Sequence, residues 1–169
     1  TYGLYGTDTT FALAADVAAL EGGLRTVVTS SGTSAITLAL SAVLAAGDHV
    51  LVADTVYGST RKFCDEVLTR FGVVPEYFDP VDLDDLAGRF RPETRAVFLE
   101  APGSHTFEMM DVPAAADLAH RHCATVLMDN TWATPLFFRP LAHGVDLSIQ
   151  PATKYLSGHS DVMLGTITA

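Results

Sequence analysis

Short runs of apolar and β-branched residues alternate along this chain with longer segments that carry apolar residues at helical spacing. The short runs favour strands, and the longer segments favour helices. Strands are expected at residues 25–29, 49–53, 73–78, 96–100, 125–129 and 145–149, with a seventh beginning near Met163. Helices are expected at residues 11–20, 34–46, 61–70, 83–90 and 112–123, the first of them capped by Thr10.

The alternation of strands and helices predicts an α/β domain with a mostly parallel, mixed sheet and helices on both of its faces. The chain has no internal repeat, low-complexity run or linker, so residues 1–169 are predicted to form one domain. In such sheets, ligands bind beyond the carboxyl ends of the strands. Candidate functional residues are therefore expected in the loops that follow the strands.

Composition restricts the kind of protein. Hydrophobic residues make up 49% of the chain and charged residues 18%, which indicates strands buried on both faces or a large contact with another chain. The net charge of −10 argues against a nucleic-acid partner, because phosphate backbones bind basic surfaces. No apolar run reaches the roughly 18 residues of a membrane helix. Cys64 and Cys123 form no CxxC pair, so a cytoplasmic protein without a disulfide framework is expected.

Residues 31–34, Ser-Gly-Thr-Ser, follow an expected strand and open an expected helix. Free backbone N–H groups and the helix dipole favour an anion at such a turn, and glycine lets a phosphate approach closely. Serine and glycine are also ordinary capping residues, so the motif alone leaves both interpretations open. It matches neither GxxxxGK[ST] nor GxGxxG, which argues against a P-loop or a dinucleotide-binding turn.

Three further residues stand at the ends of expected strands. Asp129 either caps the next turn or holds a cationic ligand nitrogen. Lys154 lies among small and hydroxylated residues and is either a solvated surface group or an amine that forms a Schiff base. Tyr57 either packs on the surface or stacks on a flat ligand. Together with the phosphate-binding turn, these groups match the contacts that pyridoxal phosphate requires.

Other chemistry has little support in the sequence. The six histidines show no HExxH or comparable spacing, so no metal site is predicted. No GxSxG elbow indicates a serine hydrolase.

Four segments resemble the Cys/Met-metabolism (trans-sulfuration) family of pyridoxal-phosphate enzymes: residues 31–36, 47–50, 129–135 and 152–161. The Asp-Asn-Thr block and the Thr-Lys-Tyr…Gly-His-Ser-Asp block are highly specific in this order. Within the family, residues 98–104, 130–133 and 148–154 resemble the cystathionine β-lyase branch. The γ branches more often have Asn-Pro where this chain has Ser104-His105, and Phe in place of Trp132.

The resemblance implies a fold type I large domain with a role for each candidate residue. Lys154 would form the Schiff base with pyridoxal phosphate and later move the proton. Asp129 would pair with the pyridinium nitrogen, and Tyr57 would stack on the cofactor ring.

Four other residues are implied to bind the cofactor phosphate. Gly32 and Thr33 would donate backbone N–H groups, and Thr153 would donate its hydroxyl. Tyr2 would reach the phosphate of a neighbouring subunit, which implies a homo-oligomer, a tetramer whose sites are shared between subunits.

Three departures from the family pattern stand out. Leu4 occupies the position of a phosphate-binding arginine, and Pro151 occupies that of a phosphate-binding serine. The chain also begins without Met and ends at Ala169, before the family's C-terminal domain. Residues 1–169 are therefore expected to be the cofactor-binding large domain of a longer subunit, with the N-terminal arm and the C-terminal domain lying outside it.

The activity implied by the resemblance is that of a carbon–sulfur lyase in methionine biosynthesis. It would convert the sulfur amino acid cystathionine to homocysteine, pyruvate and ammonia by β-elimination. Alternatives within the family are γ-lyase, γ-synthase and sulfhydrylase reactions. An alternative of another class is an inactive fragment that serves only in binding or assembly.

Overall fold

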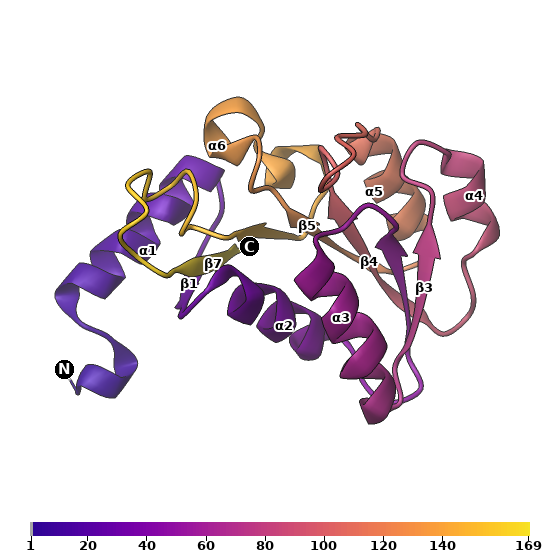
Figure 1. Cartoon of the computed structure of the whole chain (residues 1–169), viewed down its shortest axis with the longest axis horizontal. Coiled ribbons are helices and arrows are strands. Elements are labelled where there is room, and N and C mark those ends of the chain that lie inside the picture. Colours follow the sequence, from indigo (N-terminus) through magenta and orange to yellow (C-terminus); the bar gives the residue numbers. More distant parts are fainter. Residues whose placement is uncertain (1) are drawn as a thin grey trace.

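The computed structural model describes residues 2–169, whose strands form one sheet in the order β1-β7-β6-β5-β4-β2-β3 (Figure 1). The strands are β1 (Thr26–Thr29), β2 (His49–Ala53), β3 (Val74–Phe78), β4 (Thr94–Glu100), β5 (Thr125–Asp129), β6 (Leu147–Gln150) and β7 (Gly165–Thr168). Strand β7 runs antiparallel to both β1 and β6, and every other neighbouring pair is parallel. The predicted mostly parallel, mixed sheet is therefore confirmed.

The described chain also has six α-helices and three short 3₁₀ segments. They are η1 (Gly3–Tyr5), α1 (Asp8–Glu21), α2 (Gly32–Val43), α3 (Gly58–Glu66), η2 (Leu68–Phe71), α4 (Leu83–Gly88), α5 (Val112–Arg121), α6 (Thr134–Phe137) and η3 (Pro140–His143). Of these, η1 and α1 precede β1. The chain moves outward along the sheet from β1 to β3 and then returns to β6. Right-handed crossovers consequently place α2 and α3 on one face and α4 and α5 on the other. Helix α2 packs on α3, and α4 packs on α5.

Several predicted helix boundaries were wrong for identifiable reasons. Helix α1 begins three residues before the predicted start, because Thr7 rather than Thr10 is its cap and accepts the Thr10 N–H at 3.3 Å. The helix predicted at residues 61–70 is divided into α3 and the 3₁₀ segment η2, which ends at Gly72 in the left-handed region.

The central strands explain the high apolar content of the chain. All residues of β2 are buried, as is nearly all of β4. Because helices cover both faces of a parallel sheet, these strands need no alternation of apolar and polar residues. None of the helices within residues 2–169 is long and apolar enough to span a membrane.

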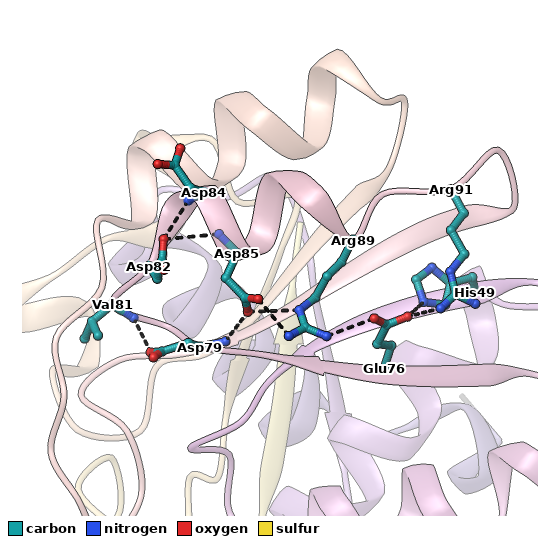
Figure 2. Close-up of polar contacts among 9 residues, drawn as sticks. All are labelled: His49, Glu76, Asp79, Val81, Asp82, Asp84, Asp85, Arg89 and Arg91. Carbon is teal, nitrogen blue, oxygen red and sulfur yellow. Dashed lines mark hydrogen bonds and ion pairs between the residues drawn. The ribbon is translucent and has the colours of Figure 1, made fainter.

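Charged residues of β2, β3 and the segment between α4 and β4 form a cluster (Figure 2). The buried ring of His49 bonds to Thr94 through Nδ1 at 2.8 Å, and its Nε2 lies 3.3 Å from Glu76 Oε2. Glu76 also accepts from Arg89 at 2.9 Å and from Arg91. Burial, together with the charge of Arg91, lowers the pKa of His49. This cluster therefore joins strands at the end opposite to the predicted site.

Candidate active site

The loops after the parallel strands meet at one edge of the sheet, because the carboxyl ends of parallel strands point the same way. Tyr57 follows β2, Asp129 ends β5 and Lys154 follows β6. The turn at Gly32 follows β1, which runs parallel to β6 because both are antiparallel to β7. The fold thus brings the principal predicted site residues to the edge where ligands bind in such sheets.

Asp129 is the last residue of β5 and is only 4% exposed. Its Oδ1 accepts two hydrogen bonds from Thr131, from the backbone N–H at 3.0 Å and from the hydroxyl at 2.5 Å. Burial raises the pKa of the Asp129 carboxyl, and the two Thr131 bonds oppose that rise. Within the described part of the chain, no donor contacts Oδ2. The carboxylate is therefore held by one oxygen and offers the other to a ligand.

Glu100 is a second buried carboxyl at this edge, and the sequence analysis missed it. It ends β4, stands in register with Asp129 on β5 and is 5% exposed. Its Oε2 accepts the Tyr57 N–H at 2.8 Å, and its Oε1 accepts the Ser104 hydroxyl. Burial, and then the charge of Asp129, raises the pKa of Glu100. The signal in the sequence was a glutamate at the end of an otherwise apolar strand, the same pattern that marked Asp129.

Tyr57 is the N-cap residue of α3 and is 51% exposed. Its ring lies beside that of His105, with centroids 6.3 Å apart and planes inclined by 24°. The Tyr57 ring therefore stands at the open edge of the site, and the Tyr57 backbone N–H is held by a hydrogen bond to Glu100. This arrangement suits stacking against a flat ligand.

The N-termini of α2 and α3 meet beside these residues, since the hydroxyls of Thr33 and Ser59 lie 3.4 Å apart. Ser31 caps α2 by accepting the Ser34 N–H at 3.0 Å. The N–H groups of Gly32 and Thr33 have no acceptor in the described chain, as is usual in the first turn of a helix. These free donors, with the dipoles of two helices, can bind a phosphate.

Gly32 also has a packing role. A Cβ at this position would lie 2.5 Å from Cβ of Pro151, the residue that follows β6. The start of α2 therefore lies directly against the segment that carries Lys154. Pro151, noted as a departure from the family pattern, fills this space and has no N–H to offer a phosphate.

Thr153 and Lys154 lie in the turn after β6. The Thr153 hydroxyl donates to the Leu164 carbonyl at 3.1 Å and accepts the Leu164 N–H at 2.9 Å. Its proton is thus used within the protein, and the predicted phosphate contact would require exchange of that bond. Lys154 is exposed, and its Nζ forms no ion pair or hydrogen bond within residues 2–169. No group of the described chain therefore occupies its amine.

Tyr2 is not brought to this edge. It precedes η1, is 71% exposed and contacts the ring of Tyr5 with centroids 6.2 Å apart. The segment before α1 extends away from the sheet (Figure 1). Leu4 in the same segment is also exposed. The predicted contact of Tyr2 with a phosphate therefore stays a prediction about a neighbouring subunit.

The residues gathered at the edge fit pyridoxal phosphate. The free Oδ2 of Asp129 suits a pyridinium N–H, and the free amine of Lys154 suits an aldehyde. Two helix N-termini suit the phosphate, and the Tyr57 ring suits the face of the pyridine. The described residues contain no group of three or more His, Cys, Asp or Glu side chains that could hold a metal ion.

The fold and the site together are those of an α/β domain suited to binding pyridoxal phosphate. The chain belongs to the family described as "Cys/Met metabolism PLP-dependent enzyme", whose family model matches residues 1–169. This assignment confirms the family and the cofactor that the sequence motifs implied.

Known proteins of the family are similar along nearly the whole chain. A protein of Rhizobium johnstonii named "Putative cystathionine beta-lyase" is 55% identical over 169 residues, which cover 100% of this chain and 43% of the relative. The cystathionine beta-lyase MetC of Escherichia coli is 44% identical over 167 residues, covering 98% of this chain and 42% of MetC. The chain thus spans about two fifths of the length of these relatives.

A solved structure agrees with the fold. The crystal structure of cystathionine gamma-lyase from Lactobacillus plantarum, complexed with L-serine, superposes with a TM-score of 0.94 at 37% identity. The match covers 97% of this chain and 43% of that one. Proteins with β-lyase and γ-lyase names are therefore both similar to this chain.

Proposed function

We propose that residues 1–169 are the cofactor-binding large domain of a cystathionine β-lyase. The observation that carries the proposal is the joint placement of Lys154, Asp129 and Tyr57 at one edge of the sheet, with a free amine and a free carboxylate oxygen. The β-lyase names of the relatives at 55% and 44% identity support this reaction.

The residues of the chain have distinct tasks in this proposal. Asp129 would hold the pyridinium nitrogen, Tyr57 would stack on the cofactor ring, and the N–H groups of Gly32 and Thr33 would bind the phosphate. Pyridoxal phosphate supplies an electron sink for the charge that develops at the α-carbon of the amino acid. Because an ionised Asp129 keeps the ring nitrogen protonated, it strengthens that sink.

Lys154 would hold the cofactor through its amine, and the same Nζ, when free, would take the α-proton of the amino acid. Breakage of the Cβ–S bond of cystathionine then releases homocysteine, whose sulfur gains a proton. Addition of one water to the remaining three-carbon unit yields pyruvate and ammonia. All atoms of cystathionine and water are accounted for in these three products.

A turnover assay tests the reaction. The full-length enzyme should release pyruvate and homocysteine from cystathionine in equal amounts, and Lys154→Ala should abolish the release. Lys62→Ala is the matched control, since Lys62 is the other lysine of the chain and, within residues 2–169, its only ion pair is with Glu66 on the surface of α3. Normal turnover by Lys154→Ala would contradict the proposal.

γ-Elimination is the second candidate, favoured by the similarity to the γ-lyase structure. The products separate the two reactions, because β-elimination yields pyruvate and γ-elimination yields 2-oxobutyrate. The same assay, with the keto acid identified by chromatography, therefore decides between them.

We further propose that the enzyme works as a homo-oligomer with shared sites. An open groove of about 870 Å³ is lined by apolar side chains that include Leu20, Leu136 and Phe137, the last two largely exposed. Exposed Tyr2 and Leu4 lie on the N-terminal segment that extends from the body. Burial of such side chains against another subunit is favourable. Sedimentation of the full-length protein tests this, and a monomer at all concentrations would contradict it.

A further inference from the structure

Glu100 joins two loops of the candidate active site. From the end of β4 its carboxylate accepts the backbone N–H of Tyr57 at 2.8 Å and the hydroxyl of Ser104. The Ser104 N–H donates in turn to the carbonyl of Thr55 at 2.8 Å. These bonds form a closed ring between the loop after β2 and the loop after β4.

The backbone of Gly103, in the loop after β4, also lies directly against the side chain of Thr55, in the loop after β2. A Cβ on Gly103 would lie 2.5 Å from Oγ1 of Thr55 and 2.6 Å from its Cβ. The loops therefore approach as closely as only glycine permits, which favours a fixed spacing between them.

The Glu100 carboxylate binds Tyr57, the N-cap residue of helix α3. The Tyr57 side chain makes no capping hydrogen bond. Glu100 provides an acceptor and a negative group at the positive end of the nine-residue helix, where both are favourable. The orientation of the Tyr57 ring thus depends on a residue that belongs to another strand.

We propose that Glu100 is a positioning residue. Its side chain is long enough to accept the hydrogen bond from the Tyr57 N–H, and this bond holds Tyr57 in place to stack on the cofactor. Glu100 acts through Tyr57 and need not touch the cofactor. The inference rests on the proposed function, because it assigns Tyr57 the stacking role given there.

Two substitutions of Glu100 distinguish the effect of side-chain length from the effect of side-chain charge. Glu100→Gln keeps the length of the side chain, so its amide oxygen still accepts from Tyr57 and its amide nitrogen can donate to Ser104 Oγ. Glu100→Asp keeps the charge but is one methylene shorter and cannot span the same distance. Positioning by hydrogen bonding therefore predicts that the Gln variant is the less impaired of the two.

The test uses the full-length protein and pyridoxal phosphate. Affinity is measured by titrating the apoprotein with the cofactor, and ring orientation by circular dichroism in the visible band of the holoenzyme. The Gln variant should bind within about fivefold of the wild type and keep the dichroic band. The Asp variant should bind about tenfold or more weakly and lose much of that band.

Any other ranking of the two variants in cofactor affinity and dichroism contradicts the inference. Wild-type behaviour of both variants, equal losses in both, or a smaller loss in the Asp variant would each show that reach to Tyr57 is not what Glu100 supplies. Far-ultraviolet dichroism confirms that both variants are folded. Borohydride reduction of the wild-type holoenzyme distinguishes the two proposals, since labelling of Lys154 supports the proposed function whatever the outcome at Glu100.

Discussion

Glu100 and Asp129 stand in register on the neighbouring parallel strands β4 and β5, and both carboxyl groups are buried. Adjacent strands lie about 4.8 Å apart, so two potential negative charges share a poorly solvated edge. Burial raises the pKa of each carboxyl, and for Glu100 the charge of Asp129 adds to that rise. A cationic ring nitrogen beside Asp129 would relieve this unfavourable arrangement. Ionising both buried carboxyl groups is therefore unfavourable at the edge where the cofactor is proposed to bind.

The raised pKa of Asp129 predicts the effect of pH on the apoprotein. The unfolded chain loses this proton near pH 3.9, whereas the folded protein keeps it to a higher pH. Between these values the folded state binds more protons, so the free energy of unfolding falls as the pH rises and stays lower above the folded pKa.

Asp129→Asn should remove that loss, because the amide oxygen still accepts both bonds from Thr131 and carries no charge. We expect the variant apoprotein to be more stable than the wild type at pH 8, by on the order of 1 kcal/mol or more, and to bind cofactor more weakly. Urea unfolding at pH 5 and pH 8 measures this. A wild type that is the more stable of the two at pH 8 would be inconsistent with the burial cost.

Gly32→Ala should destabilise the protein and weaken phosphate binding, since the new Cβ would lie 2.5 Å from Pro151. Overpacking of this kind typically costs about 1–3 kcal/mol. Gly58→Ala is the matched control, because Gly58 opens α3 at the same edge and a Cβ there meets nothing within 4 Å. Thermal unfolding and cofactor titration of both variants check the difference, and equal behaviour would argue against the role of the Pro151 contact.

Glu21 fixes α1 to the strand that leads to Lys154. This residue is 1% exposed and accepts from the Ser148 hydroxyl at 3.0 Å and the Gln150 amide at 2.8 Å. Glu21→Ala leaves both donors unpaired, and we expect a loss of about 2–4 kcal/mol in the free energy of unfolding.

Burial raises the pKa of Glu21, and its hydrogen bonds and the charge of Arg139 oppose the rise. Glu21→Gln can satisfy the same two partners without a buried charge, so it should retain most of the stability at pH 8. Chemical unfolding of the two variants tests the network. Similar losses for Gln and Ala would show that the charge, rather than the hydrogen bonds, stabilises this contact.

The sequence allowed the strands to be predicted well, because β2, β4 and β5 are buried on both faces and leave long apolar runs. It did not reveal α6 or the 3₁₀ segments, which are too short to show a helical period. The start of α1 was misjudged because Thr7 and Thr10 are equally good caps in isolation.

A site residue could be predicted only where it lies within a recognisable sequence motif. Asp129 and Lys154 stand in recognisable blocks, whereas the importance of Glu100 follows from its register with β5 and its bond to Tyr57. Likewise, the bonding of the Thr153 hydroxyl to Leu164 depends on a loop that returns along the chain. Such pairings between distant segments leave no local pattern.

Borohydride reduction followed by peptide mapping tests the central claim most directly. The chain contains two lysines, so Lys62 serves as an internal control for Lys154. Reduction of the purified holoenzyme should place a stable pyridoxyl group on Lys154 and none on Lys62. A reduced enzyme with unmodified Lys154, or with equal labelling of both lysines, would contradict the assignment of the cofactor site.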